Sequence, residues 1–474
     1  YKLGKNWVGA TVNLEDNSEK LKATNTFSAL SQRFLEYGAF VGKGDSTKVF
    51  VELGFLQRQN DSLQNNRIER VNHSNSYYLK SQLIKTEKSN LSVFLNYRTL
   101  KYDDTNLKDE PSLNSRILYS DRYFGQLIQT TTAYETSSGT IAQQEFTYLQ
   151  VEPGQGVYMW NDYNGNGIQE LQEFEIAPYS DLAIYVRVFL PNQVFVRTHQ
   201  NKFSQALNFN FNQWQNEKGF KKFASHFYNQ TSFLIDRKIK RNGDNFDLNP
   251  FSKEEEELIG LNTNFRNSLF FNRGKQYHST TYSFLLNESQ NLLSVGSVAA
   301  KNQSHQVQYQ HLVKKSWLFN FSGSTTSTES TSENYPNRNF EIDGYQIEPK
   351  IGYLFSKNAS WDIFYEFQQK ENQIGAFETL KQTRLGTSFT FNSEKGFSMN
   401  GEFSMYNNSY DGNALSAVGF QMLEGLQPGK NQTWRLLLQK NLTQYLDINI
   451  NYQGRNSETS KTIHTGNVQL RAFF

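Results

Sequence analysis

Residues 162–173 carry oxygen-bearing side chains at the spacing of a calcium-binding loop. Calcium prefers about six to eight hard oxygen ligands, supplied by a loop that folds around the ion. Such loops use side-chain oxygens at positions 1, 3 and 5, a main-chain carbonyl at 7, a direct or water-mediated oxygen at 9 and a bidentate carboxylate at 12. Gly167 occupies position 6, where a glycine permits the sharp turn. The predicted ligands of a Ca²⁺ ion are therefore Asp162, Asn164, Asn166, Ile168, Glu170 and Glu173.

The surroundings of this loop differ from those of a helical EF-hand. Gly154, Gly156 and Pro178 flank it, where helices would be expected. The pattern resembles instead the D-x-N-x-N-G-x-x-[DE]-x-x-E calcium loops of extracellular adhesin modules, over about a dozen residues. The alternative interpretation is an Asn-Gly turn with acidic residues nearby by chance. Under the calcium interpretation, the ion would fold a long extracellular loop at residues 153–192 and would catalyse no reaction.

Strict alternation of apolar and polar residues predicts the strands that position this loop. Residues 446–453 read LDININYQ, and residues 468–473 read VQLRAF. A strand with a side-chain period of two places the apolar residues on one face and the polar residues on the other. In an outer-membrane barrel these faces meet lipid and the lumen. We therefore predict an all-β fold over residues 1–474: a transmembrane antiparallel β-barrel of the bacterial outer membrane with roughly 20 strands, short periplasmic turns and long extracellular loops.

The composition of the 474 residues agrees with a barrel. Only 37% of the residues are hydrophobic, with a mean hydropathy of −0.69, which leaves little for several dry cores. Aromatic residues reach 15%, which suits aromatic girdles at two membrane interfaces. No stretch approaches the roughly 18 consecutive apolar residues of a transmembrane helix. The chain has no cysteine, so it contains no disulfide and no thiol metal site. Its 48 basic and 46 acidic residues are nearly balanced, which argues against nucleic acid as a partner.

Short polar turns and longer polar loops divide the chain into predicted hairpins. The predicted tight turns lie at residues 42–47, 87–90, 136–140, 216–219, 272–275, 314–316, 356–359, 392–396 and 440–444. The predicted outward loops lie at residues 60–74, 102–114, 241–257, 326–339 and 421–430. A soluble array of β-sandwiches is the alternative, but it would need Pro- and Gly-rich linkers between domains. Because Tyr1 is not an initiator Met, we expect a processed form or the carboxyl part of a longer chain.

Two phrases carry a family resemblance. Residues 172–178 together with 185–189, and residues 422–430, resemble the carboxyl-terminal barrels of large outer-membrane proteins from Bacteroidota. The resemblance extends from about residue 115 onward. It implies an outer-membrane location and a longer protein with a preceding region, and it supplies no activity.

A barrel enzyme, a lipase or a protease, is the second alternative and is not favoured. A barrel lipase or protease needs a Ser, His and acid or amide constellation, or paired carboxylates near the rim. The seven histidines lie in no recognisable nucleophile or metal motif. They are His73, His199, His226, His278, His305, His311 and His464.

Two non-enzymatic functions remain open. One is an outer-membrane channel or a TonB-dependent transporter. Such a transporter carries a plug ahead of its barrel, and because residues 1–55 already read as strands, the plug would lie upstream. The favoured interpretation is a component of an outer-membrane assembly that acts in secretion, protein insertion or anchoring of surface lipoproteins, because substantial surface loops present a surface to partners. The predicted partners are outer-membrane lipid and other outer-membrane proteins or surface lipoproteins.

Overall fold

The chain is almost entirely β-structure. The computed structural model describes residues 1–104, 106, 108–241, 243–244, 246–252, 258–275, 277–293, 296–393, 396–443 and 445–473. Within these residues, twenty strands have ten residues or more. They are β2 (Asn6–Asn17), β5 (Gln32–Gly44), β6 (Phe50–Gln64), β7 (Arg67–Lys85), β8 (Asn90–Tyr102), β9 (Glu110–Tyr123), β10 (Ile128–Gln150), β13 (Tyr185–Asn210), β14 (Phe227–Lys240), β15 (Leu258–Phe271), β16 (Ser279–Leu293), β17 (Gly296–Val313), β18 (Trp317–Ser332), β19 (Phe340–Ser356), β20 (Ala359–Asn372), β21 (Thr379–Ser393), β22 (Phe397–Asp411), β23 (Gly429–Thr443), β24 (Leu446–Ser457) and β25 (Ile463–Ala472).

The remaining elements are short. The short strands are β1 (Lys2–Leu3), β3 (Lys20–Leu21), β4 (Thr26–Phe27), β11 (Tyr158–Trp160) and β12 (Phe174–Ile176). The helical turns are η1 (Phe124–Gln126), η2 (Leu171–Glu173), η3 (Ser180–Leu182), η4 (Phe211–Trp214), η5 (Pro336–Arg338), α1 (Phe220–Ala224) and α2 (Ala417–Leu423). Among the helices so described, none is long and apolar enough to cross a membrane.

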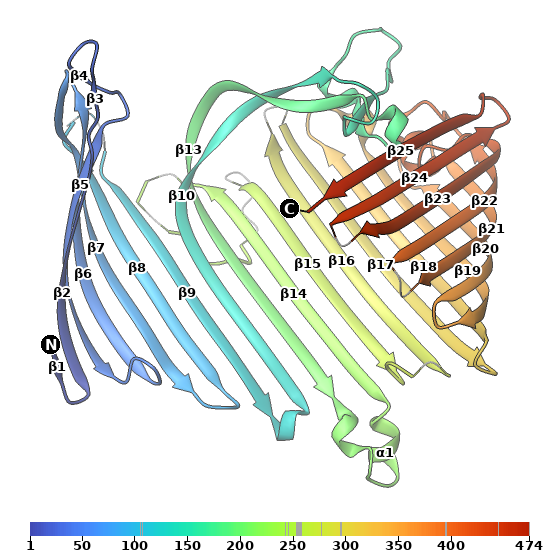
Figure 1. Ribbon diagram of the computed structural model, residues 1–474, viewed down its shortest axis with the longest axis horizontal. Helices are drawn as coiled ribbons and strands as arrows, with labels where there is room; N and C mark the ends of the chain where they lie inside the picture. The colour runs from blue at the N-terminus through green and yellow to red at the C-terminus, as the bar shows by residue number, and fades with distance from the viewer. Residues whose placement is uncertain are drawn as a thin grey trace. The chain divides into compact units, whose positions relative to one another are not determined.

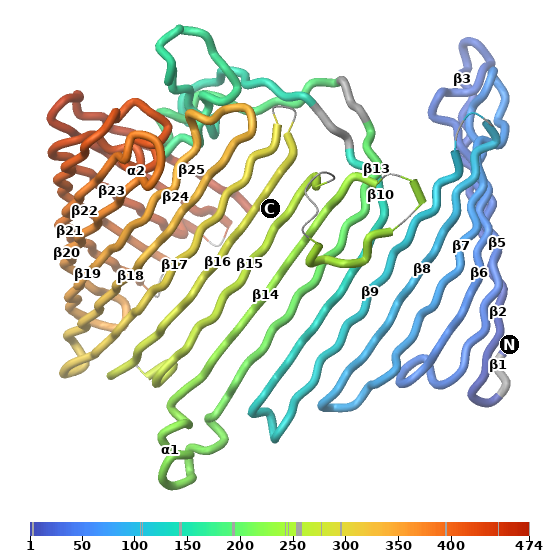
Figure 2. Tube along the Cα trace, turned by 180° about the vertical axis from the view of Figure 1, so that it is seen from behind, coloured from blue at the N-terminus to red at the C-terminus, as the bar shows by residue number. Residues whose placement is uncertain are grey.

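The chain divides into two compact units. Unit 1 comprises residues 1–142, 194–213 and 230–264, and unit 2 comprises residues 143–193, 214–229 and 265–474. Figures 1 and 2 show the strands of each unit running side by side. The long strands β10 and β13 pair with each other.

Unit 1 is an antiparallel meander in which β2, β5, β6, β7, β8, β9 and β10 pair in this order. Val8 lies opposite Val41, which in turn lies opposite Leu53. Residues directly opposite in an antiparallel pair share a face of the sheet. All three side chains are about half exposed, at 51, 53 and 54%. One face of unit 1 is therefore apolar and uncovered within the described residues.

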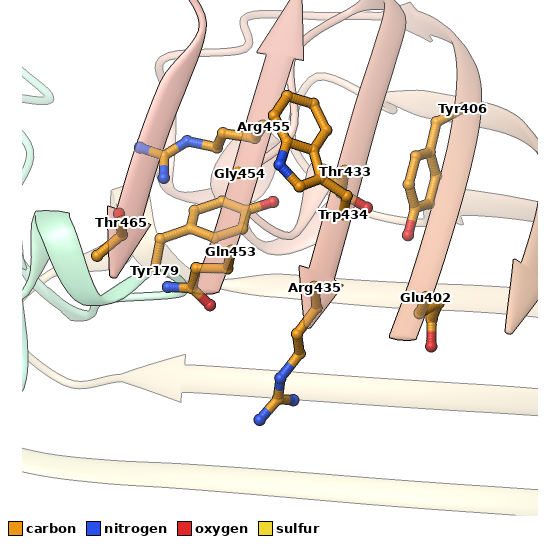
Figure 3. Close-up of a pocket in the computed structure, with 10 residues that line it drawn as sticks. All are labelled: Tyr179, Glu402, Tyr406, Thr433, Trp434, Arg435, Gln453, Gly454, Arg455 and Thr465. Carbon is orange, nitrogen blue, oxygen red and sulfur yellow. The ribbon is translucent and has the colours of Figure 1, made fainter. Parts of the chain in front are cut away.

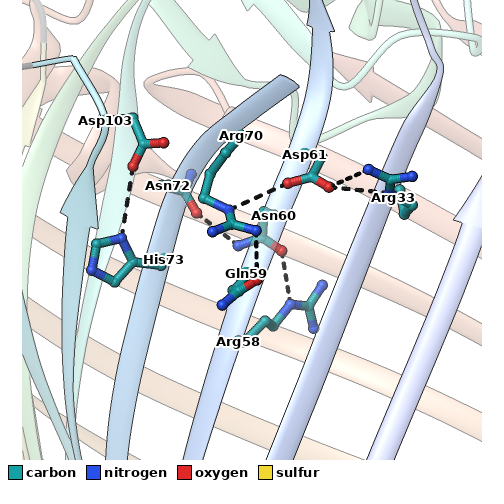
Figure 4. Close-up of polar contacts among 9 residues, drawn as sticks. All are labelled: Arg33, Arg58, Gln59, Asn60, Asp61, Arg70, Asn72, His73 and Asp103. Carbon is teal, nitrogen blue, oxygen red and sulfur yellow. Dashed lines mark hydrogen bonds and ion pairs between the residues drawn. The ribbon is translucent and has the colours of Figure 1, made fainter. Parts of the chain in front are cut away.

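The hairpin of β6 and β7 corrects the predicted loop at residues 60–74. The strands continue through most of this stretch and meet at Asn65 and Asn66, whose φ angles of 47° and 64° make a tight turn. Polar side chains pair across the extended strands, because Asp61 lies 2.8 Å from Arg33 and 3.5 Å from Arg70 (Figure 4). The polar residues 60–74 therefore form the paired end of a hairpin, and not the irregular loop that was predicted.

Unit 2 contains a second meander, in which β16 to β25 pair with their neighbours in chain order. One face, here called the apolar face, carries exposed apolar side chains. Ile351 lies opposite Ile363, and Tyr365 lies opposite Leu385. The exposed side chains of this face include Trp317, Phe319, Phe321, Ile347, Ile351, Trp361, Ile363, Tyr365, Leu385, Phe403 and Met405.

The alternate residues of the same strands form a polar face. Lys350 and Asp362 form an ion pair of 3.1 Å. Arg384 lies 3.3 Å from Glu366 and 2.6 Å from Glu402, so one guanidinium serves two carboxylates. Charged groups that leave bulk water need such partners.

A tight fit on the polar face supports this network. Phe364 lies opposite Gly386 and is buried beneath the Arg384 guanidinium, which is 4.7 Å from the ring centre. A Cβ atom at Gly386 would lie 2.2 Å from the Phe364 ring. The glycine is therefore needed for the close approach of the ring.

The main apolar cluster of buried residues lies at one end of unit 2, where α2 covers β19 and β21. Its members are Ile342, Leu380, Val418, Met422 and Leu423. The helix begins after Ser416, whose Oγ accepts a hydrogen bond of 3.0 Å from the Gly419 amide. Such a cap satisfies an amide that has no partner inside the helix.

The predicted fold class is confirmed: the chain is all-β and antiparallel, with about twenty long strands and tight turns between many of them. The predicted turns at residues 42–47, 87–90, 314–316 and 356–359 overlap the connections between consecutive strands, with some of their end residues inside the strands. The predicted turn at 136–140 is wrong, because these residues lie within β10. Some residues of predicted turns and loops lie outside the described part of the chain: 105, 107, 242, 245, 253–257, 394–395 and 444.

Candidate metal centre and its attachment

The predicted calcium loop lies in the connection between β10 and β13. This connection spans residues 151–184, because residues 185–192 of the predicted loop belong to β13. Its base is aromatic. Phe174 stacks on Tyr148 with 4.0 Å between ring centres and packs edge-on against Tyr185 at 5.0 Å. Phe174 and Tyr185 are both buried, so the connection has a small core of its own.

Residues 162–168 form a series of side-chain-capped turns. The carboxylate of Asp162 accepts hydrogen bonds from the amides of Asn166 at 3.1 Å and Gly167 at 2.8 Å. The Asn166 side chain in turn accepts a bond of 2.6 Å from the Ile168 amide. Gly165 and Gly167 have φ angles of 72° and 71°, a region that glycine enters without a steric penalty. The sequence N-G-N-G therefore curls this loop around the Asp162 side chain.

Glu173 lies at the centre of the loop and is 1% exposed. Its carboxylate accepts hydrogen bonds from the Trp160 indole at 2.8 Å and from the Tyr163 amide at 3.2 Å. Glu170 is more exposed and accepts a bond of 2.8 Å from the Asn164 side-chain amide. The residue predicted as the bidentate ligand thus also organises the loop.

The structure places all six predicted ligand residues in one folded loop. Their oxygens are of the hard type that calcium prefers. In the part of the chain that the structure describes, no three His, Cys, Asp or Glu side chains are close enough together to hold a metal ion. The carboxylates of Asp162 and Glu173 are bonded instead to amide and indole N–H groups of the same segment. Calcium binding remains a prediction.

A half-buried series of contacts joins the loop to the connection between β18 and β19. The Tyr163 hydroxyl donates a hydrogen bond of 3.2 Å to Glu175, and Glu175 forms an ion pair with Arg338 of η5. Arg338 also donates a bond of 2.5 Å to the Gln172 carbonyl. Burial raises the pKa of Glu175 and, together with the nearby Glu175 carboxylate, raises that of Tyr163. Arg338 opposes the shift of Glu175, because its charge favours the carboxylate.

A second attachment joins the connection to β24. Arg455 donates hydrogen bonds of 2.6 and 2.7 Å to the two oxygens of Asp181. The bonds from Arg455 hold the pKa of Asp181 below its ordinary value. The Tyr179 ring lies 4.2 Å from the same guanidinium, and the Gln453 amide donates a bond of 2.8 Å to Ser180. Sequence reasoning missed both attachments, because no local pattern links residues so far apart.

A cavity of 240 Å³ lies beneath this second attachment (Figure 3). Tyr179 closes it on the side of the connection, and β22 to β25 form its floor. The residues that line it are Tyr179, Glu402, Tyr406, Thr433, Trp434, Arg435, Gln453, Gly454, Arg455 and Thr465. The Trp434 indole packs over Gly454. Because successive side chains of a strand point to opposite faces, Trp434 lies on the face opposite to Thr433 and Arg435. Polar side chains therefore dominate the cavity.

The histidines have structural contacts. Five contacts involve polar groups: His73 with Asp103, His199 with Ser138, His226 with Asn272, His305 with Tyr282 and His464 with Tyr452. His199 and Ser138, 3.1 Å apart, form a serine–histidine pair, but the Ser138 hydroxyl also lies 3.1 Å from the Leu113 amide and 3.3 Å from its carbonyl. That bonding fixes the hydroxyl in the sheet and does not favour a nucleophile.

The sequence matches no protein-family model and no curated protein. Several solved structures are similar to this chain at very low identity. The siderophore receptor PirA from Pseudomonas aeruginosa is 8% identical, with a TM-score of 0.40, over 98% of this chain and 73% of that one. The ferric yersiniabactin uptake receptor FyuA from Yersinia pestis is 8% identical, with a TM-score of 0.37, over 99% and 76%. The FrpB iron transporter from Neisseria meningitidis is 11% identical, with a TM-score of 0.36, over 98% and 73%.

Proposed function

We propose that this chain is an outer-membrane β-barrel that lets a hydrophilic solute pass, as a channel or as a transporter whose plug lies upstream. The observation that carries the proposal is the contrast between the two faces of β18 to β23. The apolar face exposes Ile351, Ile363 and Leu385, which suits lipid contact. The polar face carries the ion pairs of Lys350 and Arg384, which suits a water-filled interior.

This proposal replaces the assembly component that the sequence favoured. The assembly role depended on the prediction that surface loops recruit partners. The polar face, in contrast, extends along whole strands. It therefore suits contact with water or a solute along the length of the sheet, and not only contact with a partner at the loops. We place the connection at residues 151–184 at the cell-surface end, where it controls access.

Electrical recording from planar bilayers tests the passage of solutes. The purified protein should give discrete conductance steps, and Arg455→Ala should raise the open fraction because it releases the connection from β24. Ser460→Ala, in the short loop that follows β24, is the matched control and should leave the open fraction unchanged. If folded, heat-modifiable protein inserts but neither form conducts, an open channel is excluded. The transporter alternative would then be tested by solute uptake into cells that express the protein, and absence of uptake would refute it.

We also propose that residues 162–173 bind Ca²⁺ and thereby strengthen the attachment to η5. The potential ligands support this proposal. The carboxylates of Asp162, Glu170 and Glu173 and the side-chain amides of Asn164 and Asn166 all belong to one loop, which is curled around Asp162. Tyr163 and Glu175 would transmit the effect, since Tyr163 bonds both Glu173, through its amide, and Glu175, through its hydroxyl. The bound ion would thus stiffen the segment that contacts Arg338.

A further inference from the structure

We propose that the cavity beneath Tyr179 binds an acidic monosaccharide unit, with the sugar carboxylate on Arg435. The proposal concerns binding alone and does not depend on whether the ligand then crosses a membrane. It follows from the unpaired groups that line the cavity and from the size of the cavity.

Arg435 is the cationic anchor. It lies opposite Glu402 on one side and opposite Gln453 on the other. Glu402 nevertheless pairs with Arg384 at 2.6 Å. Among the described residues, Arg435 has no ion pair or hydrogen bond, whereas Arg384 and Arg455, the other arginines nearby, have acidic partners. Figure 3 shows the Arg435 guanidinium extending away from the strand backbone. A planar guanidinium with free N–H groups matches a carboxylate with two parallel hydrogen bonds.

Hydroxyl groups supply the second part of the recognition. The side chains of Tyr179, Tyr406 and Thr433 border the cavity, and none of their hydroxyls has a hydrogen-bond partner in the described part of the chain. The Gln453 amide nitrogen already donates to Ser180, and its side-chain carbonyl adds a hydrogen-bond acceptor. A ligand rich in hydroxyl groups satisfies such a mixture, while the tyrosine rings offer apolar surface to its C–H groups.

The volume limits the ligand. A cavity of 240 Å³ lies below the roughly 300–1,000 Å³ of sites for drug-sized ligands, so a single sugar ring suits it better than an extended chain. The cavity is lined by charges of both signs. Asp181 neutralises Arg455, and Glu402 forms an ion pair with Arg384, which also pairs with Glu366. A small ligand with one negative charge and several hydroxyls therefore fits the cavity better than a multiply charged anion.

Isothermal titration calorimetry on the full chain in detergent tests the assignment with glucuronic acid, glucose, acetate and phosphate as probes. Glucuronic acid should bind at least about tenfold more tightly than glucose or acetate, because only it engages both kinds of group. Phosphate or acetate binding as tightly as glucuronic acid would reveal a simple anion site and overturn the proposal. Absence of saturable heat with glucuronic acid would overturn it as well.

Variants assign the binding to this cavity. Arg435→Ala should weaken glucuronic acid about tenfold and leave glucose nearly unchanged, and Arg435→Lys should recover part of the loss. Tyr406→Phe keeps the ring and should weaken both sugars. Arg67→Ala, an exposed arginine at the start of β7, is the matched control and should change neither. Heat modifiability confirms that each variant is folded. An unchanged affinity in folded Arg435→Ala would refute the role of this residue.

Discussion

Arg455 and Asp181 are 274 residues apart in the chain, yet their guanidinium and carboxylate meet in two parallel hydrogen bonds of 2.6 and 2.7 Å. This geometry is bidentate, and it is stronger and more specific than a single charged contact. The pair is only partly exposed, so it is less screened by salt than a surface pair. It is therefore a well-defined place at which to detach the connection at residues 151–184 from β24.

The first prediction concerns the pH dependence of this attachment. The pKa of Asp181 lies below its ordinary value of 3.8, so its contribution is present above pH 3.8 and is lost as the pH falls through the lowered pKa. Cleavage of residues 151–184 by a protease that is active in acid should be constant from pH 8 to 5 and should rise only below about pH 4. Asp181→Asn should make cleavage fast at every pH. A loss of protection between pH 7 and 5 would assign the attachment to another group.

The second prediction tests the calcium loop. Terbium, a luminescent substitute for calcium, should be sensitised by Trp160, whose indole bonds the predicted ligand Glu173 at 2.8 Å. We expect an affinity on the order of 10⁻⁴ to 10⁻³ M, the range of extracellular calcium modules. Calcium should displace terbium and should slow cleavage between residues 154 and 184.

The choice of variant matters, because Glu173 also holds the loop together. Glu173→Ala would loosen the loop with or without an ion. Asp162→Asn removes one charge and keeps one of the two oxygens that accept amide hydrogen bonds, so it should abolish terbium luminescence and loosen the loop without calcium less than Glu173→Ala does. Asp104→Asn, in a different loop, is the control. Full luminescence in Asp162→Asn would leave residues 162–173 as an ordinary turn.

A third prediction compares the two faces of β24. Ile450 lies between Leu438 and Val468, whereas Asn449 lies between Gln439 and Gln469. Ile450→Arg on a lipid-facing side should lower the free energy of unfolding by about 2–4 kcal/mol. Asn449→Arg on a wet face should be tolerated. Urea titration of the protein in lipid vesicles gives both values, and equal losses would contradict the assignment of the faces.

The fourth prediction concerns the fit of Phe364 against Gly386. Gly386→Val places carbon atoms where the ring lies and should lower stability by about 1–3 kcal/mol, in the range of other overpacked sites. Gly466→Ala is the control, because nothing lies within 4 Å of a Cβ atom at that position. The change in midpoint in the same urea titration measures the effect. Similar midpoints for the two variants would show that the ring moves aside at little cost.

Much of the fold was predictable because the strands follow a local rule. The alternation in residues 446–453 sets the register of β24, and polar turns such as residues 87–90 and 314–316 set where strands end. The rule failed at residues 136–140, a Thr-Ser-Ser-Gly-Thr stretch that usually favours a turn. Here the pairing of β10 with β13 holds these residues in a strand, so a distant partner overrides the local preference.

The candidate site was predictable only in part. The six predicted ligands lie within twelve consecutive residues, and a local pattern can reveal such a set. The indole of Trp160 on Glu173 and the ion pair of Glu175 with Arg338 depend on how the chain returns on itself. Arg435 carries no motif at all. Its importance depends on Glu402 being engaged elsewhere, which only the side-chain geometry reveals.

The large sequence separation between Asp181 and Arg455 also bears on when the connection docks during folding. Closing a loop of this length costs conformational entropy, and contacts between distant residues form slowly. Most strands in the second half of the chain pair with their immediate neighbours, so these hairpins form without waiting for the connection. Because Arg455 lies on β24, we expect its contact with Asp181 to form after this strand has paired. We therefore expect the connection at residues 151–184 to dock after the neighbouring strands of unit 2 have paired.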